Sequence, residues 1–264
     1  MLYLGVKSRY TDLGIATKFS GNVELHEEIE DLQGKNFKKQ VEEIKKFVGL
    51  GKIKRLSIHM PMKNSNGEYA NPALEREAQE YVVKCIELAR NFPQFEIPIV
   101  IHAAGDKVTD KKEAAIRLGK FIDANFTKNG IIPSVENGTA GKINSNDWFY
   151  CREDFEELIK NSKRARITFD ICHFFLNELN YTKFEEFIME FKAKIVNIHV
   201  ADADPSQRSH GFQIGSGKID FDRVFQILKD NIEGEVHVIP EVNYEHENNY
   251  KEFEIAYSRL KKYI

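Results

Sequence analysis

Two runs decide the fold of this chain: Ile131-Ile-Pro-Ser-Val-Glu136-Asn137-Gly-Thr-Ala-Gly141 and Ile167-Thr-Phe-Asp170-Ile-Cys-His173. Each begins with apolar, largely β-branched residues that favour a buried strand, and the strand stops on a carboxylate. A charge at the end of a buried strand is costly unless it binds something. The stretch from Ile131 to His173 therefore predicts strands that carry metal ligands to one rim of a barrel.

The rest of the chain alternates short β-branched runs with amphipathic stretches, as in an α/β fold with parallel strands. Strands are predicted at residues 2–6, 22–26, 55–59, 97–102, 131–136, 167–170, 194–199 and 235–241. Helices are predicted at residues 35–50, 74–91, 110–124, 152–161, 181–191, 220–231 and 250–263. This order predicts a (β/α)8 TIM barrel. An open doubly wound sheet would normally have a glycine-rich turn after its first strand, but this chain has Gly5-Val-Lys-Ser-Arg9, with no helix expected directly after it.

Composition predicts one domain over residues 1–264, because no linker or low-complexity segment divides the chain. The net charge of −3 gives no bulk attraction to nucleic acid, although a local basic groove is still allowed. Cys85, Cys151 and Cys172 lack CxxC spacing, which favours a reducing compartment and argues against cysteine-bound zinc. No apolar run approaches the length of a membrane span, so we expect a cytoplasmic protein without a membrane partner.

Barrel active sites lie at the C-terminal ends of the strands, and residues of metal-ligand type gather there. These candidate ligands are His59, His102, Glu136, Asp170, His173, His199, His210 and Glu241. Imidazole nitrogens and carboxylate oxygens suit zinc, manganese, iron or magnesium. One histidine at a strand end is more often a packed residue, but the ordered set indicates a catalytic centre with two or three ions. Such a centre suits phosphoester hydrolysis, and one or two ions also suit a sugar isomerase.

Three runs resemble the signature sequences of endonuclease IV, a family within the xylose isomerase-like barrel superfamily. They are Val135-Glu136-Asn137-Gly-Thr-Ala-Gly141, Asp170-Ile-Cys-His173 and His199-Val-Ala-Asp202, within a resemblance that spans about residues 56–241. The first two runs are the most specific.

This resemblance implies three zinc ions that jointly bind the phosphate 5′ of an abasic site in DNA. Its ligand sets would be His59, His102 and Glu136 for the first ion, Glu136, Asp170, His199 and Glu241 for the second, and His173 and His210 for the third. Glu136, Glu241 and His173 are the predicted catalytic residues, with Glu136 as the bridging ligand and Glu241 helping to hold the attacking hydroxide. Asn137, Asp202 and Arg208 are predicted to contact substrate, although a loop or turn cap is an equal interpretation of Asp202.

The chain also departs from endonuclease IV. Arg208-Ser209-His210 stands where that family has an Asp-x-His pair, so a ligand of the third zinc is missing. The region after the second strand is acidic, running from Glu24 to Asp31, where the endonuclease has a basic and polar loop that enters DNA. Met62 replaces an aromatic residue of the lesion pocket, and Lys7 lies in place of a histidine motif of the first strand.

Three functions stay open at this point. The first is a zinc phosphodiesterase that acts on DNA with abasic sites, favoured by His59 and His102 together. The second is an isomerase or epimerase of a small sugar or sugar phosphate, which would use Mn²⁺ or Mg²⁺ and is favoured by Arg208 and the acidic loop. The third, a barrel that binds without turnover, is disfavoured by the complete ligand set. We favour the first by a narrow margin.

Overall fold

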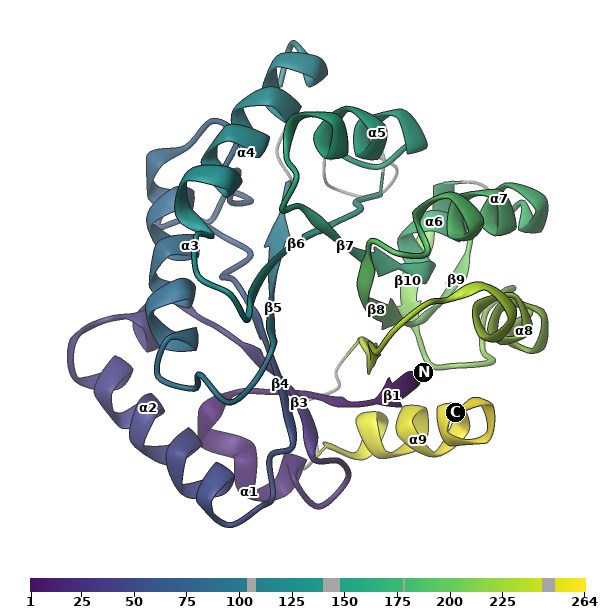
Figure 1. Cartoon of the computed structure of the whole chain (residues 1–264). Coiled ribbons are helices and arrows are strands. Elements are labelled where there is room, and N and C mark those ends of the chain that lie inside the picture. The colour runs from purple at the N-terminus through teal and green to yellow at the C-terminus, as the bar shows by residue number, and fades with distance from the viewer. Residues whose placement is uncertain (104–107, 140–147, 178, 244–249) are drawn as a thin grey trace.

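The computed structural model describes residues 1–103, 108–139, 148–177, 179–243 and 250–264. Ala140 and Gly141, at the end of the first quoted run, lie outside these residues. Nine parallel strands form one nearly closed sheet in the order β1-β11-β8-β7-β6-β5-β4-β3-β2 (Figure 1). The strands of this sheet are β1 (Leu2–Leu4), β2 (Val6–Ser8), β3 (Asn22–His26), β4 (Arg55–His59), β5 (Ile97–His102), β6 (Ile131–Glu136), β7 (Arg166–Asp170), β8 (Ile195–Val200) and β11 (Val236–Pro240). The predicted TIM barrel is confirmed.

Helices surround this sheet on its outer side (Figure 1). They are α1 (Leu13–Ala16), α2 (Gly34–Gly49), α3 (Arg76–Ala89), α4 (Lys111–Asn125), α5 (Arg152–Asn161), α6 (Ile171–Asn177), α7 (Tyr181–Phe191), α8 (Phe221–Asn231) and α9 (Lys251–Leu260). Short 3₁₀ turns also occur among the described residues, at Tyr10–Asp12, Ile29–Leu32 and Lys261–Tyr263. Most of the predicted elements agree with these bounds to within a few residues.

The barrel closes at Gly5, which divides the predicted first strand into β1 and β2. β1 pairs with β11 and β2 pairs with β3. The two short strands therefore lie at opposite ends of the strand order, and the chain between them connects these ends. Gly5 donates its N–H to the carbonyl oxygen of Val238 at 2.8 Å. A Cβ atom at position 5 would lie 2.5 Å from Ile239 Cδ1 and 3.0 Å from the carbonyl oxygen of Asn22. Only glycine lets the chain pass this close to both neighbours.

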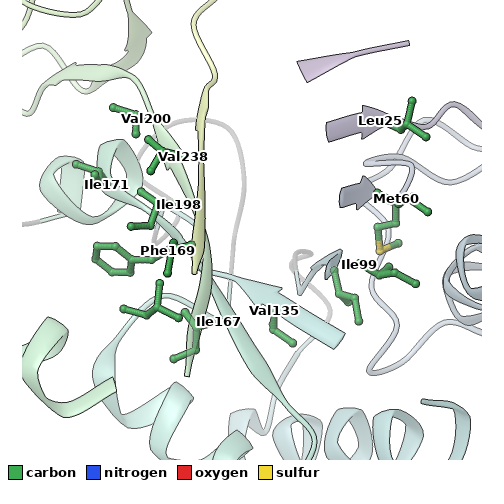
Figure 2. Packing of buried hydrophobic residues seen from close by; sticks show 14 of the residues in the cluster. Leu25, Met60, Ile99, Val135, Ile167, Phe169, Ile171, Ile198, Val200 and Val238 are labelled. Atoms are coloured by element: carbon green, nitrogen blue, oxygen red, sulfur yellow. The ribbon is translucent and has the colours of Figure 1, made fainter. Parts of the chain in front are cut away.

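Apolar side chains fill the space between the sheet and the helices. Figure 2 shows part of this layer, including Ile167 and Phe169 of β7, Ile198 of β8 and Val135 of β6. Because side chains alternate across a strand, the residues between these apolar positions face the barrel interior. Toward the C-terminal ends of the strands these interior residues are polar, and Ser57, Ser134, Thr168 and Asn197 are all fully buried.

Three parts of the fold were not predicted. A 3₁₀ turn and α1 follow β2 closely, although no helix was expected there; Tyr10, Leu13 and Ala16 are buried, but the segment is too short to show a clear period. α6 begins directly after β7, where Asp170 Oδ1 accepts the N–H of His173 at 2.6 Å. The loop after β8 contains an antiparallel hairpin, β9 (Asp202–Asp204) and β10 (Ser209–Phe212).

Candidate metal centre

The ends of β4, β5, β6, β7, β8 and β11 bring six of the predicted ligands together. Among the described residues, three overlapping groups place their ligand atoms within 4.8 Å of one another. These groups are His59, His102 and Glu136; His59, His199 and Glu241; and Glu136, Asp170, His199 and Glu241. The first and third are the sets that the resemblance implied for the first two ions.

Glu136 lies between two of these groups and presents a different oxygen to each. Its Oε2 is 3.0 Å from His102 Nε2 and 3.6 Å from His59 Nε2. Its Oε1 is 3.1 Å from His199 Nδ1. A carboxylate in this position can bridge two cations, as predicted for Glu136.

The group of Glu136, Asp170, His199 and Glu241 gathers around Nδ1 of His199. Glu241 Oε2 lies 2.6 Å from this nitrogen. Asp170, at the end of β7, is held by Asn137, which donates to its carbonyl oxygen at 2.9 Å and accepts its N–H at 2.8 Å. Asn137 thus ties the end of β6 to the end of β7, and its predicted contact with substrate stays a prediction.

Backbone carbonyls fix the orientation of two histidine rings. Nδ1 of His59 lies 2.8 Å from the carbonyl oxygen of Met60, and Nδ1 of His173 lies 2.8 Å from that of Asn137. A carbonyl only accepts, so each Nδ1 carries the proton and each Nε2 is left with a lone pair in the neutral ring. For His59 that lone pair faces Glu136 and His102, which suits a metal ligand.

Burial and mutual charge shift the pKa values of this cluster strongly. Burial opposes ionisation of Glu136, but His199 and His102 outweigh it and hold the pKa of Glu136 well below its usual range. Burial likewise opposes the charged form of His199, but Glu24, Glu136 and Glu241 raise its pKa well above the usual value. Burial raises the pKa of Asp170 to about 6, with a further contribution from Glu136. A proton on His199 therefore partly balances the carboxylates, and a cation would have to displace it.

The ammonium group of Lys7 lies against the cluster beside Glu241. Lys7 lies on β2, is 2% exposed, and donates to Oε1 of Glu241. Burial tends to raise the pKa of Glu241, but Lys7 and His199 hold it well below the usual range. Burial, aided by Lys7, lowers the pKa of His59 to about 4.

His173 and His210 lie beside the cluster with their ring centroids 5.2 Å apart. Neither belongs to a group of three converging ligand atoms among the described residues, and the third ion stays a prediction. Burial tends to lower the pKa of His173, but Asp170 and Glu136 outweigh it and raise that pKa. Arg208, two residues before His210 in the β9–β10 hairpin, is exposed and has a left-handed backbone with a φ of 51°.

Asp202 supports the glycine-rich loop that follows the hairpin. Its two carboxylate oxygens accept four backbone N–H groups, from Ala203, Gly215, Gly217 and Ile219, at 2.8 to 3.1 Å. A Cβ at position 217 would lie 2.4 Å from Asp202 Oδ1, so glycine is required there. These bonds indicate that Asp202 shapes the loop, and its predicted contact with substrate stays a prediction.

Sequence analysis assigned Glu24 to the acidic region after the second strand, but it is a fully buried residue of β3 and belongs to this cluster. Its Oε1 lies 3.0 Å from Nε2 of His199. The signal was present in the alternation Val23-Glu24-Leu25-His26, because Val23 and Leu25 are buried apolar residues and Glu24 must then face the barrel interior. Lys7 was noted only as a departure from endonuclease IV, not as a member of the site.

The donors of this cluster fit a divalent metal ion. They are imidazole nitrogens and carboxylate oxygens with no thiolate, as in catalytic metal sites. Oε2 of Glu136 and Oε2 of Glu241 are buried and accept no well-aligned hydrogen bond from the described residues, although ring nitrogens lie close to both. Buried carboxylate oxygens left in this way are costly unless a cation binds them.

The sequence pattern of the xylose isomerase-like TIM barrel family matches residues 19–262. The chain therefore belongs to this family. No curated protein matches the sequence. None of the helices in the described part of the chain is both long and apolar enough to cross a membrane.

Several solved structures share this fold. A D-tagatose 3-epimerase-like protein is 21% identical with a TM-score of 0.67, over 98% of this chain and 96% of that one. AP endonuclease family 2 from Brucella melitensis is 14% identical with a TM-score of 0.69, over 92% and 93%. The IOLI protein with a bound zinc atom is 16% identical with a TM-score of 0.70, over 98% and 95%. These likenesses place the chain among barrels that include epimerases and an endonuclease.

Proposed function

We propose that this chain is a phosphodiester hydrolase that works with two divalent metal ions, with zinc as the favoured metal. The position of Glu136 carries this proposal, because its two oxygens face two separate ligand groups. An epimerase with one ion would need only one of these groups, and Glu136, Asp170, His199 and Glu241 could hold that ion. His59 and His102 would then have no ligand role at the strand ends, although His59 is fully buried and orients its Nε2 toward Glu136.

DNA with abasic sites is the proposed substrate, by the resemblance to endonuclease IV. Two divalent ions, when bound, would lower the pKa of a water molecule and neutralise the phosphate oxygens of the substrate. His59, His102 and Glu136 would hold the first ion, and Glu136, Asp170, His199 and Glu241 the second.

The chain's own groups would then orient and balance charge around the phosphate. Glu241 is the best placed group to hold the nucleophile, since its carboxylate lies between Lys7 and His199. His173 is 16% exposed at its side chain, and its Nδ1 is tied to Asn137. Its Nε2, which has a lone pair in the neutral ring, could then accept a proton at the substrate or, once protonated, donate one. Arg208, exposed on the hairpin, can contact a phosphate oxygen.

A nicking assay tests this activity. The protein is loaded with zinc, its bound metal is counted, and it is mixed with a duplex that carries one tetrahydrofuran abasic analogue. We expect cleavage 5′ to the analogue, none of a matched duplex with an intact base, and none by Glu136→Gln. No cleavage by a protein that holds two ions per chain would contradict the DNA substrate. Failure to hydrolyse a simple diester, bis-p-nitrophenyl phosphate, as well would contradict the hydrolase.

A second candidate is a metal-dependent epimerase of a small sugar or sugar phosphate. Arg208 favours it, because this exposed side chain occurs where endonuclease IV has an aspartate ligand of the third zinc. The names of several similar structures also favour it, including a D-tagatose 3-epimerase-like protein and an L-ribulose 3-epimerase. One bound Mn²⁺ or Mg²⁺ per chain, with exchange of a ketose hydrogen into D₂O, would favour the epimerase over the hydrolase.

A further inference from the structure

Glu24 crosses the barrel interior beneath the metal centre. It lies on β3, and its Oε2 accepts from Asn197 Nδ2 of β8 at 2.7 Å and from Ser57 Oγ of β4 at 3.1 Å. β3 and β8 are separated by four strands in the sheet order, so Glu24 reaches Asn197 only through the interior. Two neutral donors thus fix one oxygen of a carboxylate that is fully buried.

The other oxygen of Glu24 faces the His199 ring from below the cluster. Oε1 lies 3.0 Å from Nε2 of His199, within ion-pair distance but without a well-aligned hydrogen bond, and Asn197 Nδ2 lies 3.2 Å from the same nitrogen. The other ring nitrogen of His199, Nδ1, lies 2.6 Å from Glu241 Oε2 and 3.1 Å from Glu136 Oε1. His199 therefore has one nitrogen toward Glu24 and the other toward the ligand pocket.

We propose that Glu24 is a positioning residue of the metal centre, whose carboxylate accepts the Nε2–H of His199 when a metal is bound and so keeps the lone pair of the ring at Nδ1, toward the metal. This role rests on the metal centre of the proposed function, but not on the substrate. A carboxylate behind a ligating histidine fixes its tautomer and ring orientation and increases its basicity as a ligand. Ser57 and Asn197 hold the carboxylate in place.

Stability alone gives a poor account of this residue. A buried charge pair is often no more stable than well-packed apolar side chains of similar volume, and other interior layers of TIM barrels are mostly branched apolar residues. A carboxylate aimed at a ligand ring is what a metal site requires there.

The test compares metal affinity in Glu24→Gln, which keeps the shape and removes the charge, with the wild-type protein. Zinc is titrated against a competing chelator. We expect the affinity of the second ion to fall by about 10- to 100-fold in the variant. Ser57→Ala is the matched control, because it removes a donor to Oε2 and leaves Oε1 beside His199; we expect a smaller loss.

A second readout reports on the ring itself. In the zinc-loaded wild type, ¹⁵N–¹H spectra should show the Nε2–H of His199 as a downfield proton, and Glu24→Gln should move this proton upfield. Unchanged affinity and an unchanged His199 proton in a folded variant would overturn the proposal. A wild type that binds zinc but cleaves no diester would contradict only the proposed activity. A wild type that binds no divalent ion would overturn both.

Discussion

Nε2 of His59 and Nε2 of His102 lie 3.1 Å apart, and both approach Oε2 of Glu136. The proton of His59 is held at Nδ1 by the carbonyl of Met60, so its Nε2 has a lone pair to offer. Two ring nitrogens and a carboxylate oxygen that converge in this way form three sides of a cation site. The same carboxylate faces His199 with its other oxygen, which ties this site to its neighbour.

His102→Gln should therefore lower the metal content from two ions per chain to one. The group of His59, His102 and Glu136 loses one of its three protein ligands, while the group of Glu136, Asp170, His199 and Glu241 is unchanged. Atomic emission spectroscopy after dialysis against zinc measures this ratio. His237→Gln, at the opposite end of the barrel, is the matched control and should keep two ions. Equal metal content in both variants would show that His102 is not a ligand.

Lys7→Met should destabilise the metal-free protein and yet increase its gain in stability on binding zinc. Removal of one partner of a buried ion pair costs about 3–5 kcal/mol, and Lys7 is the buried partner of Glu241. The ammonium group also repels a divalent ion, so its removal makes the ligand set more negative. Thermal unfolding with and without zinc measures both effects, and Lys7→Arg should resemble the wild type. A smaller zinc-induced shift in Lys7→Met would refute this account of the charge.

The sequence was sufficient to predict the barrel and to predict that candidate ligands gather at its rim. β4, β5 and β6 are confirmed with the predicted bounds, because each is a β-branched run bounded by turn residues. His59, His102 and Glu136 come together because the carboxyl ends of parallel strands meet at one rim.

The supports beneath that rim were harder to predict. Glu24 approaches His199, and Lys7 donates to Glu241. Each pair joins strands far apart in the sequence, so it depends on closure of the sheet rather than on local sequence pattern. The split of the first strand at Gly5 has the same origin, because it depends on contacts with β3 and β11. α6 was missed because its seven residues continue a strand without a break.

Glu27→Gln should stabilise the metal-free protein at alkaline pH. Burial raises the pKa of Glu27 from its ordinary 4.5 to about 8, so the fold favours the neutral carboxyl. The stability that Glu27 contributes is fully present below pH 4.5 and is lost as the pH rises toward 8, by roughly 3–5 kcal/mol in total. Glutamine stays neutral and can keep the contact with Gln40.

Urea unfolding at pH 5, 6.5 and 8 measures this effect. The stability difference between Glu27→Gln and the wild type should grow with pH across that window, whereas Glu42→Gln, an exposed position on α2, should show no such trend. A constant difference at all three pH values would mean that Glu27 is already ionised in the fold.

Asp202→Asn should loosen the glycine-rich loop without changing the metal content. The carboxylate accepts four backbone N–H groups, whereas an amide offers one oxygen and turns a second donor toward the others. We expect a loss of about 1–3 kcal/mol. Hydrogen exchange of the amides of Gly215, Gly217 and Ile219 should accelerate, and Asp204→Asn, whose side-chain bonds are to Ser206 and Gln207, should leave them unchanged.

Arg208→Asp should increase the metal content by one ion per chain. His173 and His210 already lie with their rings 5.2 Å apart, and a carboxylate at position 208 would supply the missing member of an Asp-x-His pair. The backbone of Arg208 has a φ of 51°, which aspartate tolerates better than most residues. Arg208→Asn shares that tolerance but offers no charge, so it should bind no additional ion. The gain should disappear when His210→Ala is added to Arg208→Asp. Persistence of the extra ion in that double variant would place it outside the pair of histidines, and no gain at all would mean that the hairpin does not bring position 208 to them.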